Sequence, residues 1–164
     1  MDIVSKPDLH EVQNAFEQAE KELKNRFDFR GTDAAIEEVE GGYKLTCSTE
    51  EKVKSVADVL EDKFIKRKLS IKYLERKDPV PSGARFTMSV LLKKSLDTEN
   101  AKKIVAMIKE NKQFKVSSSI HNDKKTGDSK VRVESKNIDE LQAVQQFLRG
   151  QELPVQLSFE NYQR

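Results

Sequence analysis

Residues Arg26-Phe27-Asp28-Phe29-Arg30-Gly31 form the most sharply patterned stretch of the chain. Aromatic and charged residues alternate, so in a strand the two phenylalanines would share one face and Arg26, Asp28 and Arg30 the other. Gly31 can follow with a turn that a residue with a Cβ would resist. The pattern predicts a strand with one aromatic face and one charged face.

Each face of this stretch has two interpretations. Arg26, Asp28, Arg30 and Gly31 are candidate nucleotide-binding residues, because arginine donates paired hydrogen bonds to guanine or phosphate and a carboxylate can accept from guanine. The alternative is a salt-bridged face in which Asp28 neutralises the arginines. Phe27 and Phe29 are predicted to fill a core, and the alternative is base stacking. The aromatic pattern of a true RNA-recognition strand is missing.

Length and composition bound the class of protein. The 164 residues suit one larger domain or two small ones. With 36% hydrophobic and 35% charged residues the chain is polar but too apolar and patterned for disorder. A net charge of +2 excludes a strongly basic nucleic-acid coat protein, although local patches can exist. Cys47 is the one cysteine, which fits a reducing compartment, and no apolar run approaches the roughly 20 residues of a membrane span. We therefore expect a cytoplasmic protein with no membrane partner.

The apolar spacing of the first half predicts alternating strands and helices. The expected elements are a short strand at Asp2–Ser5, a helix from Pro7-Asp8 to near Asn25 with Leu9, Val12, Phe16, Ala19 and Leu23 inward, strands at Ala34–Glu40 and Tyr43–Ser48 around the Gly41-Gly42 turn, a helix capped by Ser48 or Thr49, and a strand over Leu69, Ile71 and Tyr73. Asp78–Gly83, rich in proline, is predicted to be the linker.

The second half repeats this order after the linker. The expected elements are a strand at Phe86–Leu92, a helix at Asp97–Asn111, strands at Phe114–Ile120 and Lys130–Glu134, a helix capped by Ser135 or Asn137, and a strand at Val155–Phe159. A constant offset along the chain overlays Val53, Val56 and Leu60 on Leu141, Val144 and Leu148, and it also overlays Leu69 and Ile71 on Leu157 and Phe159. The overlay supports an internal duplication.

Both halves therefore read strand–helix–strand–strand–helix–strand, the order of a ferredoxin-like βαββαβ unit. The predicted fold class is α+β, with two tandem ferredoxin-like, ribonucleoprotein-like domains. In each domain an antiparallel sheet carries both helices on one face. The other face of each sheet is open to bind a base or to pack against another part of the protein.

Several segments resemble the bacterial YajQ family over the whole chain. They are Asp2-Ile3-Val4-Ser5, Arg26–Gly31, Ala101-Lys102-Lys103-Ile104-Val105, Asp139-Glu140-Leu141-Gln142-Ala143-Val144 and Phe159-Glu160-Asn161-Tyr162. The resemblance implies tandem ferredoxin-like domains whose first strands are exchanged between halves. It also implies nucleotide binding, with cyclic di-GMP as the ligand of some members, and nucleic-acid binding. Where family members commonly carry Lys-Arg-Gly, this chain has Lys66-Arg67-Lys68.

Strand exchange would give one domain at 8–95, including the strand at 86–93, and a second made of 1–7 with 96–164. The sequence is equally compatible with a simple tandem split into 1–77 and 84–164. The resemblance favours the exchanged arrangement.

Two basic clusters add candidate phosphate contacts. Lys66, Arg67 and Lys68 follow a predicted helix, and a second cluster comprises Lys93, Lys94, Lys102 and Lys103. Interaction with a helix dipole and ordinary solvation are the alternative roles. His10 and His121 lack metal-ligand spacing, and the sequence has no Walker loop, dinucleotide fingerprint or nucleophile elbow. We expect no catalysis, no metal and no cofactor.

The preferred prediction is a non-enzymatic nucleotide-binding protein, a cyclic di-GMP-type second-messenger receptor that acts through a protein or DNA partner such as a transcription regulator. One alternative is an RNA- or ssDNA-binding module that uses the open sheet faces and the basic clusters. A second alternative is a protein-interaction scaffold.

Overall fold

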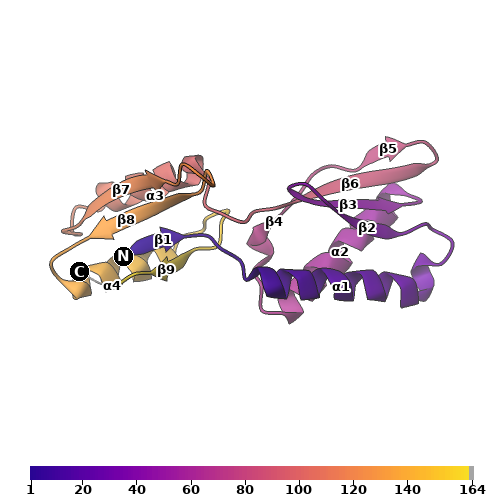
Figure 1. The fold of residues 1–164 in the computed structure, drawn as a ribbon, viewed down its shortest axis with the longest axis horizontal. Coiled ribbons are helices and arrows are strands. Elements are labelled where there is room, and N and C mark those ends of the chain that lie inside the picture. The colour runs from indigo at the N-terminus through magenta and orange to yellow at the C-terminus, as the bar shows by residue number, and fades with distance from the viewer. Residues whose placement is uncertain (163–164) are drawn as a thin grey trace. The chain divides into compact units, whose positions relative to one another are not determined.

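The chain folds into two compact units, each with its own sheet and two α-helices (Figure 1). The structure is a computed structural model and describes residues 1–162. Unit 2 is Pro7–Lys93, and unit 1 combines Met1–Lys6 with the chain from Lys94 onward. The described residues are thus an α+β protein with antiparallel sheets and four α-helices. No helix among them is long and apolar enough to cross a membrane.

Unit 2 packs two helices against a five-stranded sheet. Its elements are α1 (Leu9–Asn25), a 3-10 helix (Phe27–Phe29), β2 (Ala35–Val39), β3 (Gly42–Cys47), α2 (Glu50–Lys66), a second 3-10 helix (Ile71–Tyr73), β4 (Leu74–Arg76), β5 (Val80–Ser82) and β6 (Arg85–Leu92). The strand order is β2-β3-β6-β4, and β5 also pairs with β6. One core joins Phe16 of α1 and Phe64 of α2 to Leu45 of β3 and Val90 of β6, so both helices cover the same sheet face.

Unit 1 repeats this plan with a four-stranded sheet. Its elements are β1 (Asp2–Val4), α3 (Thr98–Glu110), β7 (Ser117–Asn122), β8 (Ser129–Glu134), α4 (Ile138–Arg149) and β9 (Ser158–Glu160), and the strand order is β7-β8-β1-β9. Ile104 of α3 and Leu141 of α4 share a core with Ile3 and Val131 of the sheet. The opposite sheet face carries the alternate residues, among them Asp2 and Arg132, which lie directly opposite each other.

One inner strand of each sheet has an unexpected place in the chain. In unit 1 it is β1, at residues 2–4, and in unit 2 it is β6, which follows both helices of that unit. β1 lies between β8 and β9, although some 90 residues of unit 2 separate it from α3 in the chain. β6 lies between β3 and β4 of unit 2, and it directly precedes α3 of unit 1. Local sequence order therefore does not give the strand neighbours.

The predicted helix starts and the glycine hairpin are confirmed. Asp8 caps α1 by accepting from two backbone N–H groups, Thr49 rather than Ser48 caps α2, and Asn137 rather than Ser135 caps α4. Gly41, with a φ of 82°, makes the turn between β2 and β3. Cys47 of β3 is fully buried in the unit 2 core.

The predicted strand over Arg26–Gly31 is wrong. Helix α1 ends where the Arg26 N–H donates to the Glu22 carbonyl, and the chain then forms a 3-10 turn in which Arg30 N–H donates to the Phe27 carbonyl. The Thr32 hydroxyl closes the turn on the Phe29 carbonyl at 2.6 Å. A 3-10 turn does not keep alternate residues on one face. Phe29 is therefore buried as predicted, whereas Phe27 is 80% exposed and fills no core.

Other local predictions fail where tertiary hydrogen bonds decide the conformation. The strand predicted over Leu69, Ile71 and Tyr73 is a helix end and a 3-10 turn, and β4 begins only at Leu74. Asp78–Gly83 is no linker, because β5 within it pairs with β6 around Gly83. The strand predicted from Phe114 begins at Ser117, and the last strand begins at Ser158.

One residue of the predicted α1 stripe is also misplaced. Leu9 was expected to face inward, but it lies in the first turn of the helix and is 53% exposed.

Candidate functional site

Two groups of polar residues stand out as candidate sites, one in each unit. The first is the turn at residues 26–31 of unit 2, which the sequence singles out. The second is a pocket in unit 1 that the sequence does not single out.

At the turn, Arg26 and Asp28 neutralise each other. Arg26 donates from Nε to Asp28 Oδ1 at 2.9 Å and from Nη2 to Asp28 Oδ2 at 2.7 Å. The hydrogen bond from Arg26 lowers the pKa of Asp28, and the hydrogen bond to Asp28 raises the pKa of Arg26. This bidentate pair is the salt-bridged arrangement that the sequence left open as an alternative.

Arg30 is the cation of the turn that keeps its charge uncompensated. No carboxylate of the described residues forms an ion pair with it, and its guanidinium lies over the exposed Phe27 ring at 5.3 Å. Gly31 follows with a φ of 71° and open space around it, so a side chain there would be strained by its backbone conformation. Phe27 and Arg30 thus present a flat aromatic and cationic surface.

Two of the predicted basic residues at the end of α2 are also paired. Lys66 contacts Asp62 at 3.1 Å and Arg67 contacts Glu11 at 3.3 Å. Glu22 connects the turn to α2, because it accepts from Arg26 and, at 2.7 Å, from Lys63. Lys66 and Arg67 thus pair with other carboxylates than Arg26 does, and among the described residues Arg30 and Lys68 form no ion pair.

Lys68 has a left-handed backbone conformation. Its φ is 60°, its N–H donates to the Ile65 carbonyl, and the next N–H donates to the Phe64 carbonyl. This is the Schellman ending of a helix, in which glycine is the preferred residue at the position of Lys68.

The second basic cluster does not lie in one unit. Lys93 ends unit 2, where its N–H donates to the Tyr73 carbonyl. Lys94 begins the second segment of unit 1, and Lys102 and Lys103 are exposed on α3.

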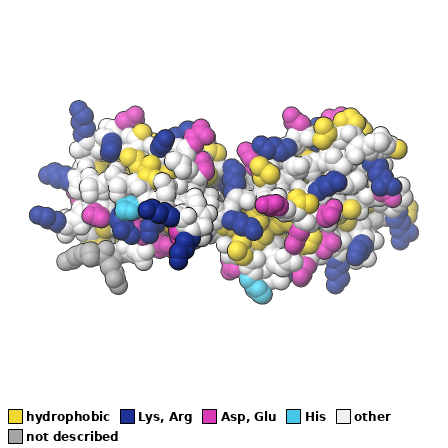
Figure 2. Space-filling model, turned by 45° about the horizontal axis from the view of Figure 1, so that its top comes forward, with side chains coloured by type: hydrophobic (Ala, Val, Ile, Leu, Met, Phe, Trp, Pro, Cys, Tyr) yellow, Lys and Arg dark blue, Asp and Glu magenta, His cyan; other side chains and the backbone are white. Residues whose placement is uncertain are grey.

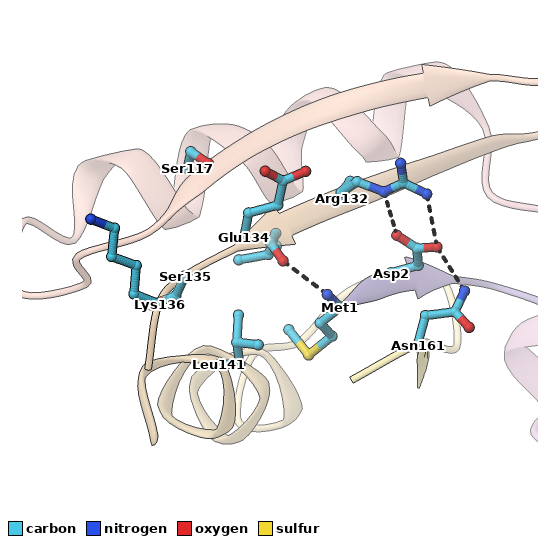
Figure 3. Close-up of a pocket in the computed structure, with 10 residues that line it drawn as sticks. Met1, Asp2, Ser117, Arg132, Glu134, Ser135, Lys136, Leu141 and Asn161 are labelled. Atoms are coloured by element: carbon cyan, nitrogen blue, oxygen red, sulfur yellow. Dashed lines mark hydrogen bonds and ion pairs between the residues drawn. The ribbon is translucent and has the colours of Figure 1, made fainter. Parts of the chain in front are cut away.

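The pocket of unit 1 has a volume of about 860 Å³. It opens where β1 begins and β8 ends, next to the first turns of α4 (Figure 3). Its lining comprises Met1, Asp2, Ser117, Arg132, Val133, Glu134, Ser135, Lys136, Leu141 and Asn161. The volume lies within the range of small-molecule sites.

Asp2 organises the polar side of this pocket. Its carboxylate is 1% exposed and accepts from Arg132 Nε at 3.0 Å, Lys130 Nζ at 3.2 Å and Asn161 Nδ2 at 2.9 Å. Burial raises the pKa of Asp2, but these donors together outweigh it and hold the pKa well below its usual range. Asp2 is therefore ionised and fixes the Arg132 side chain, as Figure 3 shows.

The other polar groups of the pocket retain hydrogen-bonding capacity. Arg132 uses Nε and Nη2 on Asp2, which leaves Nη1 as a donor. Ser117 and Lys136 add further donors, whereas the Ser135 hydroxyl already donates to the Lys115 carbonyl; Leu141 and Val133 supply apolar surface. Glu134 lines the same pocket and forms no ion pair with any described residue. The set can bind an anionic group beside an apolar one.

Sequence reasoning missed this pocket because its residues come from distant segments. Asp2 and Asn161 lie in the first and last of the segments that resemble the YajQ family, but 159 positions separate them. The one local signal was the alternation of Lys130, Arg132 and Glu134 along a predicted strand, which places three charges on one face. Among the described residues, no group of three or more His, Cys, Asp or Glu side chains is arranged to hold a metal ion.

Comparison with known proteins places the whole chain in one family. The model of the family described as "Nucleotide-binding protein YajQ-like" matches residues 1–163. The chain belongs to the YajQ-like family. It is 44% identical over 162 residues to a protein of Mycolicibacterium gilvum named "Nucleotide-binding protein", with 98% of this chain and 96% of the relative covered. Proteins of the same name from Mycolicibacterium vanbaalenii and Mycobacterium bovis are 43% and 44% identical over the same shares.

This result confirms the resemblance to the YajQ family. The names of these YajQ-like relatives describe binding and not a reaction. The Arg26–Gly31 stretch, on which the resemblance rested in part, lies within the matched residues, although its predicted conformation is wrong.

Proposed function

We propose that this YajQ-like protein binds a nucleotide, and that the unit 1 pocket is the principal site. The observation that supports it is the arginine held in place at the pocket wall: Arg132 is fixed by the buried Asp2 and keeps Nη1 for a ligand. A pre-oriented guanidinium binds phosphate with little loss of side-chain freedom. Ser117 and Lys136 supply the other phosphate donors in this proposal.

The finer proposal is a cyclic di-GMP-type second messenger as the ligand, in a cytoplasmic receptor that acts through a protein or DNA partner. The pocket volume suits a mononucleotide or a compact dinucleotide. The predicted contacts at Arg26, Asp28, Arg30, Gly31, Lys66, Arg67 and Lys68 form a proposed second set. Within that set Arg30 supports the proposal most directly, since the other arginines are paired with carboxylates.

We also propose that the two units are ferredoxin-like domains with exchanged first strands. In unit 1 the order β7-β8-β1-β9, and in unit 2 the order β2-β3-β6-β4, both fit a βαββαβ unit whose first strand is inner. β1 and β6 hold that position. Unit 2 separates β1 from the rest of unit 1 in the sequence, and β6 is the last strand of unit 2.

Titration with labelled cyclic di-GMP, GTP and a short single-stranded RNA at two salt concentrations tests the function. We expect saturable one-site binding of a nucleotide. The double substitution Ser117→Ala, Lys136→Ala should weaken that binding about tenfold, roughly 1.4 kcal/mol. The control Ser89→Ala, Lys44→Ala removes an exposed serine and an exposed lysine from unit 2. Equal affinities for the two double variants would exclude the pocket, and unchanged affinity after charge reversal at Arg26, Arg30 and Lys66 would exclude the second set.

A second candidate function, single-stranded nucleic-acid binding, is favoured by the exposed Phe27. Bases stack on aromatic rings with little sequence preference, and a nearby arginine adds a phosphate contact. RNA affinity that falls steeply with salt and drops on Phe27→Ala supports this function over the first.

A further inference from the structure

One edge of the unit 1 sheet is a comparatively long strand that lacks the features by which proteins usually prevent pairing with another chain. β7 is the outer strand in the order β7-β8-β1-β9 and spans six residues, Ser117–Asn122. It contains no proline and no Asp, Glu, Lys or Arg, and its register with β8 runs without a bulge from Ser117–Glu134 to Asn122–Ser129. One row of its backbone N–H and C=O groups therefore faces away from the sheet.

The other described sheet edges carry features that discourage pairing. β9, β4 and β5 have three residues each, and β5 also contains Pro81. β2 carries two adjacent carboxylates, Glu37 and Glu38. Short length, proline and charge are the usual means by which proteins protect edge strands from another chain. β7 has none of them.

We infer that β7 is a docking edge for an extended, acidic peptide segment of a partner protein. An added strand would satisfy the outward backbone groups of β7, which is how extended peptides bind exposed sheet edges. The inference concerns a different ligand from the proposed nucleotide and does not depend on it.

The lysines that flank β7 favour an acidic peptide as the ligand of this edge. Lys112 and Lys115 precede β7, and Lys124 and Lys125 follow it, while the carboxylates of these flanking segments are Asp123 and Asp128, which both lie in the turn after β7. An antiparallel second copy of β7 would place Lys115 of each chain near Lys124 and Lys125 of the other, which like-charge repulsion disfavours. Lysines outnumber carboxylates four to two in the segments 111–116 and 123–128, so an acidic peptide meets a net positive charge along this edge. Figure 2 shows Lys and Arg side chains interspersed with Asp and Glu side chains on the visible face of unit 1.

The two faces of β7 define the inner pattern of that peptide. Ile120 pairs with Val131 and packs on the unit 1 core, so every second peptide residue on that side should be apolar. Ser117, Ser119 and His121 occupy the open face, where Ser119 Oγ and His121 Nε2 lie 3.1 Å apart. Polar residues such as threonine fit beside them.

Fluorescence anisotropy with a defined probe tests this inference on the full chain. The probe is a labelled peptide of alternating valine and threonine with two aspartates at each end. We expect saturable binding and slower hydrogen exchange of β7 amides. N-methylation of alternate peptide amides should abolish binding, because it removes the donors that an added strand needs.

Charge reversal of the edge supplies the protein-side test. Lys115→Glu, Lys124→Glu, Lys125→Glu should weaken binding at least tenfold. The control Lys102→Glu, Lys103→Glu, Lys109→Glu makes the same charge change on exposed residues of α3 and should have little effect.

Four outcomes would overturn the inference. They are no binding at millimolar peptide, equal loss for the two triple variants, binding of the N-methylated peptide, and binding without protection of β7. A concentration-dependent dimer with protected β7 amides in the absence of peptide would instead assign the edge to a second copy of the chain.

Discussion

At the scale of single residues, Asp2 has the largest described structural role of any charged side chain in unit 1. One buried carboxylate binds three donors from β8 and from the segment after β9, so it joins three chain segments. Arg132 and Lys130 remain partly exposed, with side-chain exposures of 38% and 36%. Solvent can therefore compensate them in part if Asp2 is lost.

Asp2→Asn should lower the free energy of unfolding at pH 7 by roughly 2–3 kcal/mol, below the full cost of breaking a buried ion pair because the cations can be solvated. The folded-state pKa of Asp2 lies below its ordinary value of 3.8, so its stabilisation is complete above about pH 5 and is lost as the pH falls. Urea unfolding between pH 3 and pH 7 measures this. A variant whose deficit stays constant across that range would contradict the assignment.

Phe27 and Phe29 provide a second test at the residue scale. Phe29→Ala should cost about 3–4 kcal/mol because it leaves a cavity in the unit 2 core. Phe27→Ala should change stability by less than about 0.5 kcal/mol, as expected of an exposed side chain. Denaturant unfolding of the two variants compares the same chemical change at both positions. Equal costs would show that the turn does not place the rings as described.

At the scale of elements, hydrogen bonds at helix ends override the sequence pattern. After α2 the chain forms a Schellman ending and a 3-10 turn where alternation predicted a strand. After α1 it forms another 3-10 turn. Both places connect a helix to the next element, and the satisfaction of the last helical carbonyls decides the backbone there.

Lys68→Gly should raise the free energy of unfolding by a few tenths to about 1 kcal/mol. The left-handed conformation costs a residue with a Cβ roughly 1–2 kcal/mol, which exceeds the roughly 0.5–1 kcal/mol of extra glycine chain entropy. Lys68→Ala is the control, since it removes the same charge and keeps the Cβ. Thermal unfolding separates the two, and stabilisation by alanine would point to charge instead of backbone strain.

At the scale of the whole molecule, the position of β1 and β6 decides which fragments can fold. Residues 7–93 include β6 and therefore the complete unit 2 sheet. Residues 1–77 lack β6, so β3 and β4 would lose the strand that joins them.

We therefore expect the fragment 7–93 to fold cooperatively and the fragment 1–77 to remain unfolded or to aggregate. Circular dichroism and the dispersion of amide NMR signals measure the outcome. The full chain without residues 1–6 is the complementary case: unit 2 signals should persist while unit 1 signals collapse. A folded 1–77 fragment would support simple tandem domains.

The sequence alone determined the family, the two-fold repetition of element types, the helix caps, the glycine hairpin and most of the core. These features depend on local spacing, which neighbouring residues carry. Val53, Val56 and Leu60 of α2 are buried like their counterparts Leu141, Val144 and Leu148 of α4, as the overlay indicated. Beyond these helices the overlay fails, because Ile71 lies in a 3-10 turn and Phe159 in a strand.

Tertiary structure alone decided which polar residues meet. Asp2, Arg132 and Asn161 come together because an inner strand of unit 1 enters from the other end of the chain, and no spacing rule connects residues so far apart. Tertiary structure also decided that Phe27 faces solvent and that Arg26 forms an ion pair with Asp28. Both outcomes depend on where a helix ends and how its carbonyls are satisfied, which alternation of residue types along the chain does not specify.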